Sequence, residues 1–495
     1  MWDGSSGCIN VSIAENRCVT DLVLSKLRSL DGSVPFHPSW IYYQDTRGME
    51  GTRRQLARYL KELTGMEGEL DEDSIIVSAG CNAVLETLFS NICDPGDVVM
   101  VPSPYYATFK FDLGCRSGVV VRECEGLPNG DGGEEEDYYP TEEYLEREYQ
   151  RLSALGRPPS VLLFTNPHNP VGIIFPPHVV STMSNWADSK GLHVVSDEIY
   201  AGSSFDPVTQ PVSLLSVSES LHGTVRDNHH VVYALSKDFA MSGLRVGVGV
   251  VGGEDTRKGT AKVNDMCQVS SHTQVLVEEM LKDEVWVKEF KEEQGKRVKD
   301  RYDRVKEALR GTGVRWVEAK AGMFIWMDCR GIMREGETEE ELNGRLVEHG
   351  IMMTPGESMG MKEGGWFRCV FTAVDEQGFE TLIKRLEGLG ELRGGGVQGG
   401  GAGGGEGWGD EGPLAGLLKF PSRMKIKVVG PNDDGFVSDI TQAVKGVEDV
   451  QVENVGRNNK GKWTSVSFDI DVENEQVMRN IYEAIDKDDR VKFKL

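Results

Sequence analysis

Short apolar runs recur along the first 390 residues of the chain, and each ends in small or polar residues. They include DSIIVSAG (73–80), DVVMVPSP (97–104), SVLLFTNP (160–167), GLHVVSDE (191–198) and HVVYALSK (230–237). Segments with helical spacing, such as PPHVVSTMSNWADSKG, lie between them. Apolar strands that alternate with helices are typical of a mostly parallel sheet covered on both faces. We therefore predict an α/β domain, followed by a smaller α+β subdomain whose strands include MFIWMD and WFRCVFTAV.

A glycine-rich stretch divides the chain into two parts. Residues 394–407 hold ten glycines in fourteen positions, which is the composition of a flexible linker. We predict a body at 1–390, a linker at 391–417 and a C-terminal domain at 418–495. Within the body, we expect a large domain at about 40–280 and a small domain built from 1–39 and 281–390.

The C-terminal part has the order strand, helix, two strands, helix, strand. MKIKVVG (424–430) alternates, and the next segment places Phe436, Val437, Ile440 and Val444 on one helical face. NNKG (458–461) is a turn signal between two further strands. NEQVMRNIYEAI is the second helix and VKFKL the last strand, so the order predicts a ferredoxin-like module.

Charge and composition limit the classes of partner. The 495 residues carry a net charge of -25, which argues against nucleic acid or an anionic membrane surface as partner. No apolar stretch is long enough to span a bilayer. Nine dispersed cysteines without metal-like spacing indicate reduced thiols and no metal site. The first residues show no leader pattern, so we expect a cytoplasmic protein, or a plastid one if the N-terminus is incomplete.

Three polar groups follow three of the predicted parallel strands: Asn169, Asp197 and Lys237. Ligands of open α/β sheets bind at this edge. A lysine at a strand end is most often a solvated surface residue, so the prediction depends on the three together. Pyridoxal phosphate (PLP) needs such a set, because a lysine forms its Schiff base and a carboxylate keeps its ring nitrogen protonated.

Neighbouring motifs supply the other groups that this cofactor needs. The segment SAGCNA (78–83) runs from a strand into a helix, where backbone N–H groups can bind a phosphate. Arg245 can add a bidentate contact, and Tyr105 or Tyr106 can cover the ring. Asn169 and Tyr200 can bond the ring hydroxyl.

Eight stretches, in order, carry a resemblance to a known family: AENRCVTDLV, YQDTRGMEGTRRQLARYL, DPGDVVMVPSPYYATF, FTNPHNPVG, VVSDEIYAGSSF, LSKDFAMSGLRVG, KAGMFIWMDCR and GWFRCVFTAV. Together they resemble the class I/II aminotransferases, fold type I of the PLP enzymes, and within them the 1-aminocyclopropane-1-carboxylate (ACC) synthase branch. The likeness spans roughly residues 9 to 375. It implies an enzyme of α-amino acids that works as a homodimer, with active sites at the subunit interface.

The resemblance also implies a role for each matching residue. Lys237 forms the Schiff base and shuttles the substrate α-proton, with Asp197 and Tyr200 as its catalytic partners. The implied cofactor contacts are Gly80, Cys81, Asn82, Tyr106, Asn169, Asp197, Tyr200, Ser236, Lys237 and Arg245, with Tyr43 from the YQDTRG region. Arg368 is expected to grip the substrate carboxylate, and Glu15 and Asn169 to lie near the substrate.

Three positions depart from the ACC synthase pattern. The plant enzymes read SLSKD at the lysine, where the first serine helps to bind phosphate, and Ala234 stands in its place. Thr46 replaces a tyrosine that reaches the neighbouring subunit's cofactor, a task that Tyr43 could take over. Phe111 replaces an arginine. These changes favour transamination, with ACC synthesis from S-adenosylmethionine as the alternative, and a PLP-binding regulator as the alternative from another class.

The C-terminal part resembles the small YbeD-like family, which is related to ACT regulatory domains. The stretches that carry this likeness are FPSRMKIKVVG, KGKWTSVSFDIDVEN and IYEAIDKDDRVKFKL. No catalytic residues follow from it, and a ligand-sensing tail is the role that it suggests.

Overall fold

The chain forms two compact units, residues 1–396 and 397–495, in a computed structural model. The structure describes residues 7–30, 37–206, 208–209, 212–393, 422–447, 450–460, 463–472 and part of 477–494. The predicted glycine-rich linker lies almost wholly outside the described residues. None of the described helices is both long and apolar enough to cross a bilayer.

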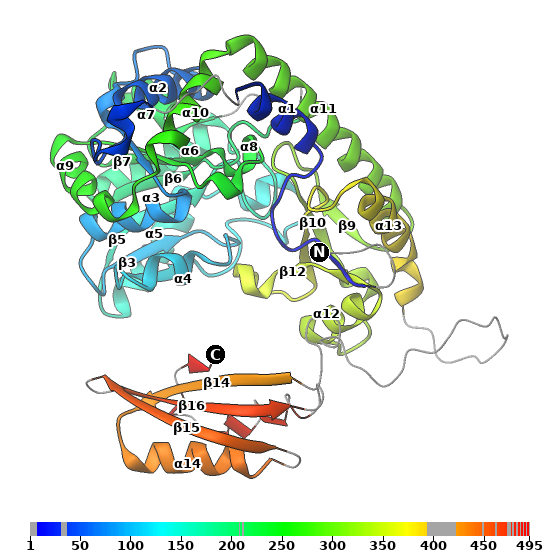
Figure 1. Cartoon of the computed structure of the whole chain (residues 1–495). Helices are drawn as coiled ribbons and strands as arrows, with labels where there is room; N and C mark the ends of the chain where they lie inside the picture. Colours follow the sequence, from blue (N-terminus) through cyan, green and yellow to red (C-terminus); the bar gives the residue numbers. More distant parts are fainter. Residues whose placement is uncertain are drawn as a thin grey trace. The chain divides into compact units, whose positions relative to one another are not determined.

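A seven-stranded sheet forms the centre of the first unit (Figure 1), in the order β2-β8-β7-β6-β5-β3-β4. Only β8 runs against its neighbours, and the pairs from β7 to β4 are parallel. The strands are β2 (Ile75–Ser78), β3 (Val98–Val101), β4 (Val120–Glu123), β5 (Pro159–Thr165), β6 (His193–Asp197), β7 (His229–Ala234) and β8 (Gly247–Val251).

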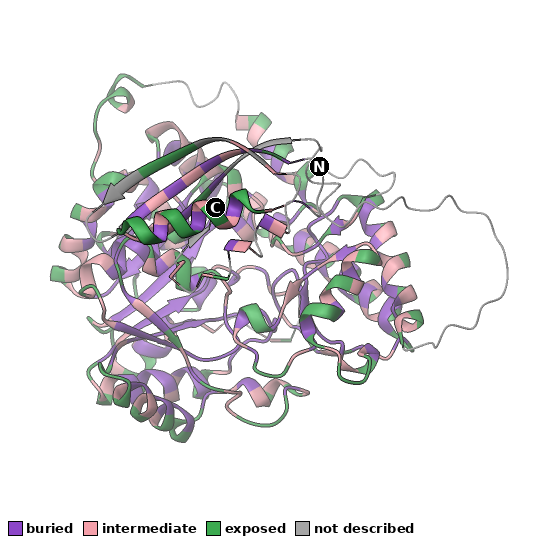
Figure 2. Cartoon of the chain, turned by 90° about the horizontal axis from the view of Figure 1, so that it is seen from below, coloured by how far each residue is buried: buried purple, intermediate pink, exposed green. Residues whose placement is uncertain are grey.

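Helices cover both faces of this sheet because its strands are apolar on both sides. Val194 of β6 packs with one cluster and its neighbour Val195 with another. The helices are α2 (Glu50–Thr64), α3 (Cys81–Ile92), α4 (Phe109–Gly114), α5 (Glu142–Ala154), α6 (Pro177–Ser189), α7 (Leu214–His222), α8 (Leu235–Asp238), α9 (Glu254–Val263) and α10 (Ser271–Lys282). Figure 2 shows the strands of this sheet as a buried layer.

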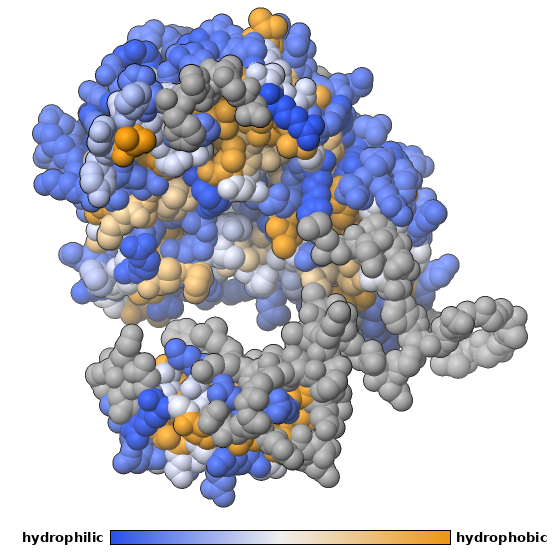
Figure 3. Space-filling model, viewed as in Figure 1, coloured by the Kyte–Doolittle hydropathy of each residue, from blue (hydrophilic) through white to orange (hydrophobic). Residues whose placement is uncertain are grey.

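A second, antiparallel sheet in the same unit has the order β12-β13-β10-β9. Beside it, the N-terminal strand β1 (Ile9–Asn10) pairs in parallel with β11 (Ile351–Met352). The strands are β9 (Arg315–Val317), β10 (Ile325–Asp328), β12 (Thr354–Pro355) and β13 (Trp366–Cys369), and the remaining helices of the unit are α1 (Thr20–Leu30), α11 (Glu284–Leu309), α12 (Glu339–Glu348) and α13 (Glu376–Glu387). Hydrophobic residues also gather in the middle of the visible face of this unit (Figure 3).

The second unit has a four-stranded antiparallel sheet of order β15-β16-β14-β17. This is the strand order of the predicted ferredoxin-like module. Its elements are β14 (Ser422–Pro431), α14 (Asp434–Lys445), β15 (Gln451–Lys460), β16 (Trp463–Val472) and β17 (Phe493–Lys494), and Val477, Asn480, Ile481, Ala484 and Ile485 are helical. Phe436, Ile440 and Val444 are fully buried on α14.

The structure differs from two local predictions, which concern the end of one strand and the position of one turn. The run 230–237 does not stay extended: β7 ends at Ala234, and Leu235–Asp238 form one helical turn. Lys237 therefore projects from a helical turn and not from a strand. In the second unit, strand pairing extends to Lys460, so the reversal comes after most of the NNKG signal.

Close packing of β8 against the start of α3 generates the first testable expectation. A Cβ on Gly247 would lie 2.3 Å from the carbonyl carbon of Gly80 and 2.8 Å from the backbone nitrogen of Cys81. Gly247→Ala should therefore lower the free energy of unfolding by about 1–3 kcal/mol, because backbone must move. Denaturant unfolding measures this change.

Gly344→Ala is the matched control, since no atom of the described residues lies within 4 Å of a Cβ at this exposed position of α12. Alanine is the better helix former, so this variant should be unchanged or slightly more stable. Equal stability of the two variants would contradict the close packing.

Candidate functional site

Asn169, Asp197 and Lys237 meet at the C-terminal edge of the large sheet. Asp197 is the last residue of β6, and its register partners are Thr165 at the end of β5 and Val232 near the end of β7. Asn169 lies in the loop after β5, and Lys237 on α8 directly after β7. The structure thus brings together the three groups on which the sequence interpretation depends.

Asp197 is a buried carboxylate with few partners. Its side chain is 4% exposed, and its Oδ1 accepts hydrogen bonds from the N–H of Ile199 at 3.2 Å and from the Cys81 thiol at 3.9 Å. Burial raises the pKa of this carboxyl to about 7, although these hydrogen bonds and Lys237 oppose the rise. A nearby cationic group would favour the ionised form, so the site suits a positively charged partner.

Lys237 is half-buried, and its Nζ donates to the carbonyl oxygen of Ala14 at 2.5 Å. Burial lowers the pKa of this amine, and among the charged neighbours the Glu15 carboxylate has the largest effect, which opposes burial. A lysine whose pKa is lowered is neutral more often near pH 7. That is the condition for a nucleophile or a general base.

Arg368 on β13 reaches the same space from the small sheet. Its Nη1 donates to Asn169 Oδ1 at 2.8 Å, and its Nη2 donates to the Ser12 carbonyl oxygen at 2.7 Å. The guanidinium also lies over the ring of Phe324, with 5.5 Å from Cζ to the ring centroid. The side chain is 5% exposed, and its Nε is buried without a hydrogen-bond partner among the described residues. A carboxylate ligand would give this group the acceptor that it lacks.

The two adjacent tyrosines lie in different surroundings. Tyr105 is 3% exposed, and its N–H donates to the Met359 carbonyl oxygen at 2.8 Å, which places it in the core. Tyr106 is only partly buried, and the electrostatic effects of Arg368 and Cys81 both reach its hydroxyl. Tyr106 is thus the one of the two tyrosines that Arg368 and Cys81 affect, and its contact with a cofactor ring stays a prediction.

Tyr200 is 2% exposed and packs edge-on against Phe324, with 5.2 Å between ring centroids. Burial raises the pKa of its hydroxyl, and Arg368 opposes this rise. Phe324 thus touches both Tyr200 and Arg368. Sequence reasoning did not single it out, although it lies inside the matching stretch KAGMFIWMDCR.

Gly80 forms a cradle at the start of α3. It caps the helix with φ 95°, and a Cβ there would lie 2.2 Å from Arg245 Nη2. The guanidinium of Arg245 therefore lies against the glycine. The N–H of Gly80 donates to the Ser78 carbonyl oxygen at 2.7 Å, unlike the free donor that we expected. The donors left for an anion are those of Cys81 and Asn82, the first residues of the helix.

The remaining predicted residues are placed as follows. Ser236 is 6% exposed beside Lys237, and Cys81 is 6% exposed at its contact with Asp197. Glu15 accepts a hydrogen bond from the Ser242 hydroxyl at 2.8 Å. Tyr43 is 99% exposed, so within a single chain it is not part of the site.

The positions that depart from the resemblance are structurally ordinary. Ala234 is fully buried at the end of β7, and its side chain has no hydroxyl that could donate a hydrogen bond. The carbonyl oxygen of Thr46 accepts from Asn264 Nδ2 at 2.6 Å. Phe111 is 72% exposed on α4. None of these positions supplies the polar group that the ACC synthase pattern has there.

The sequence did not reveal that one N-terminal segment touches several site residues. The carbonyl oxygens of Ser12 and Ala14 bind Arg368 and Lys237, and the Glu15 carboxylate binds Ser242. Backbone carbonyls carry no sequence signature, and these contacts span more than 200 positions along the chain. Only the fold could place them.

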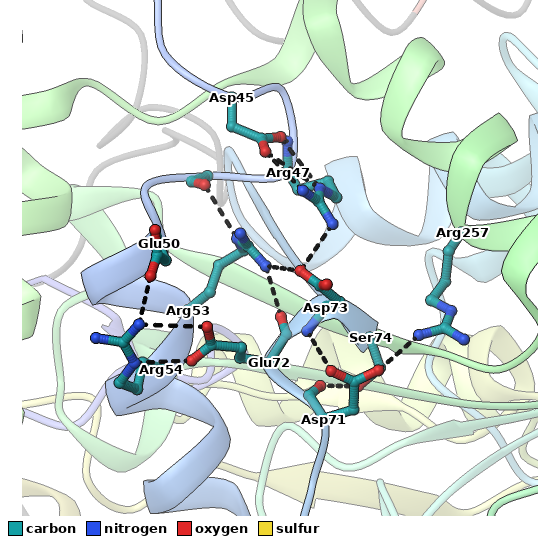
Figure 4. A network of polar contacts seen from close by, with 11 residues as sticks. Asp45, Arg47, Glu50, Arg53, Arg54, Asp71, Glu72, Asp73, Ser74 and Arg257 are labelled. Carbon is teal, nitrogen blue, oxygen red and sulfur yellow. Dashed lines mark hydrogen bonds and ion pairs between the residues drawn. The ribbon is translucent and has the colours of Figure 1, made fainter.

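A hollow of about 630 Å³ elsewhere on the first unit is not a rival site. Figure 4 shows its charged side chains paired with each other. Arg53 and Arg47 both donate to Asp73 Oδ1 at 2.9 Å, and Arg53 also donates to the Glu72 carbonyl oxygen at 2.8 Å. These bonds tie α2 to the residues before β2. Within the described ranges, no cluster of metal-ligating side chains is present.

Comparisons with known proteins agree with this geometry. Residues 36–386 match the family described as aminotransferase class I and II, and residues 415–495 match a family described as protein of unknown function (DUF493). ACC synthase 6 of Arabidopsis thaliana is 33% identical over 398 residues, which are 78% of each chain. ACC synthase 1 of Oryza sativa subsp. indica is 32% identical over 409 residues, covering 79% of this chain and 82% of the relative.

Solved structures share the fold. Aspartate aminotransferase from Thermus thermophilus with maleate superposes with a TM-score of 0.65 at 24% identity, over 77% of this chain and 92% of that one. An aminotransferase from Staphylococcus aureus has a TM-score of 0.65 at 21% identity, over 79% of this chain and 96% of that one.

The buried Asp197 carboxyl makes the ligand-free protein sensitive to pH. Its pKa is about 7 in the folded protein against 3.8 normally, so the folded state binds its proton more tightly. The ionised carboxylate therefore destabilises the fold at high pH, and this cost fades as the pH falls from 7 towards 3.8. Asp197→Asn should raise the free energy of unfolding by up to about 4 kcal/mol at pH 8, and by about 2–3 kcal/mol less at pH 5.

Denaturant titrations of ligand-free protein at the two pH values test this expectation. Asp300→Asn, at an exposed position on α11, is the control and should change stability little at either pH. A gain for Asp197→Asn that is the same at both pH values would contradict the raised pKa.

Proposed function

Because this chain belongs to the aminotransferase class I and II family, we propose that its body is a PLP-dependent enzyme that acts on an α-amino acid. The observation that carries the proposal is the meeting of a half-buried amine, a buried carboxylate and a buried guanidinium at one sheet edge. Lys237, Asp197 and Arg368 are these groups.

The residues present fit this cofactor. The Asp197 carboxylate is buried, and in the described part of the chain its donors are an N–H and a thiol, so it matches a protonated ring nitrogen. The first turn of α3 and Arg245 match a phosphate, and Gly80 keeps the guanidinium close. When bound, PLP supplies an aldehyde for the lysine and an electron sink for the substrate's α-carbon.

Each of the chain's own residues then has a task. Lys237 Nζ takes the α-proton and returns a proton, because it is the amine with the lowered pKa at the site. Arg368 holds the substrate carboxylate through a bidentate contact, and Asn169 holds Arg368 in place. Tyr106 and Tyr200 supply hydroxyl donors and aromatic surface.

Transamination is the reaction that we favour. Ala234 and Thr46 lack the hydroxyl and phenol that the ACC synthase pattern has at these positions. ACC synthesis from S-adenosylmethionine is the second candidate, because relatives named as ACC synthases are 29–33% identical to this chain. Both reactions need the same amine, carboxylate and guanidinium.

We also propose that two copies of the chain assemble around the site. Ile41, Tyr42 and Tyr43 are 71%, 70% and 99% exposed, an unusual run of large hydrophobic side chains at a surface. In a homodimer this run would be covered, and Tyr43 would reach the partner's site. The C-terminal unit has no assigned chemistry, and its role as a ligand-sensing or partner-docking domain is the alternative to a purely catalytic protein.

Replacement of the reactive amine separates an enzyme from a PLP-binding regulator. Wild-type protein with PLP should absorb visible light, and borohydride should fix the cofactor's mass on the peptide that contains Lys237. Lys237→Ala should lose both signals, and turnover should fall by about 10³-fold or more. Lys282→Ala, on the surface of α10, is the control and should behave as wild type. Retained turnover in Lys237→Ala would refute the enzymatic proposal.

Substrate assays separate the two reactions. We expect exchange of amino groups between amino acids and 2-oxo acids, followed by mass spectrometry of the products, and no methylthioadenosine from S-adenosylmethionine. Release of methylthioadenosine would replace the first candidate by the second.

A further inference from the structure

Glu15 is held from two sides of the site. Its carbonyl oxygen accepts from the Thr372 hydroxyl at 2.7 Å, just after β13 of the small sheet. Its carboxylate accepts from the Ser242 hydroxyl at 2.8 Å, in the loop between β7 and β8 of the large sheet. The contact with Thr372 fixes the position of the Glu15 backbone, and the contact with Ser242 fixes the position of its carboxylate.

Ser242 is also connected to the candidate anion site, which consists of Gly80, the first turn of α3 and Arg245; we call this site the anion cradle. It begins a short 3₁₀ turn, Ser242–Leu244, and its carbonyl oxygen accepts from Arg245 Nη1 at 2.9 Å. Arg245 lies against Gly80. Ser242 thus connects the anion cradle with the Glu15 carboxylate, which raises the pKa of the Lys237 amine.

We propose that Ser242 is a positioning residue, whose hydroxyl holds the Glu15 carboxylate on the Lys237 side of the site. The proposal rests on the function proposed above, and it concerns a residue that touches neither the amine nor Arg368. Its role is to fix the negative charge of Glu15, which interacts electrostatically with the Lys237 amine and with the α-ammonium group of an incoming substrate.

Four charged or titratable groups on different elements shift the pKa of the Lys237 amine, and Asp197 at the end of β6 faces the amine as well, because Lys237 lowers the pKa of that carboxyl. Glu15, on the N-terminal segment, and Cys81, on α3, raise its pKa, whereas Arg368 and Arg245 lower it. Among these four Glu15 has the largest effect. If the carboxylate swings away, the nitrogen of Lys237 keeps the two opposing arginines and loses its main anionic neighbour, so its pKa falls.

The test compares Ser242→Ala with Ser242→Thr, which retains a hydroxyl, and with Glu15→Gln, which removes the charge. The first readout is the pH midpoint of the visible absorbance of the PLP-loaded protein without substrate. We expect a decrease of about half a pH unit for Ser242→Ala, a larger decrease for Glu15→Gln, and little change for Ser242→Thr. The second readout is KM for the amino acid, which should rise about threefold to tenfold in Ser242→Ala, more than kcat falls.

The double variant Ser242→Ala with Glu15→Gln gives the decisive comparison. If the serine acts through the carboxylate, the double variant should titrate like Glu15→Gln alone, because the two effects share one cause. Additive shifts, or a Ser242→Ala midpoint equal to wild type, would overturn the positioning role. If wild-type protein shows no PLP fixed on Lys237 after borohydride, the proposed function fails first, which is a different result.

Discussion

Parallel hydrogen bonding between β5, β6 and β7 is the constraint on which the site depends. It brings the ends of these strands to one edge, so residues that are 28 and 40 positions apart in sequence, Asn169, Asp197 and Lys237, come together there. The apolar strands are buried on both faces, which fixes their register. Helix α3 and the loop before β8 then bring the anion cradle to the same edge, because Gly247 allows the backbone of β8 to approach Gly80 closely.

Charged groups in this site are buried without full compensation. Asp197 has a raised pKa, Lys237 a lowered one, and Arg368 keeps an unpartnered Nε. Such an arrangement costs stability in the ligand-free chain, and a ligand that brings a cation for Asp197 and a carboxylate for Arg368 would remove the cost. This energetic requirement agrees with the function proposed above.

Much of the fold and of the candidate site could be predicted from the sequence, because local sequence patterns determine them. Strand ends, the glycine before a helix and the order of motifs predicted the fold class and the position of Asn169, Asp197 and Lys237 at one edge of the sheet. The contacts of Ser12, Ala14 and Ser242 could not be predicted, because backbone carbonyls and a single hydroxyl carry no periodicity and their partners are distant in sequence. Helix α8 was also missed: the apolar run continues to Leu235, but its backbone turns at Ala234.

The segment from Ser12 to Glu15 is bonded to both sheets at once. Arg368 and Thr372 hold it on the side of β13, while Lys237 and Ser242 hold it on the side of β7. The position of this segment therefore depends on both sheets of the first unit. Any widening between the two sheets pulls a carbonyl oxygen away from the amine, and any change in the bonding of that nitrogen loosens the segment. The spacing of the two sheets and the hydrogen bond of the Lys237 nitrogen are thereby mechanically coupled.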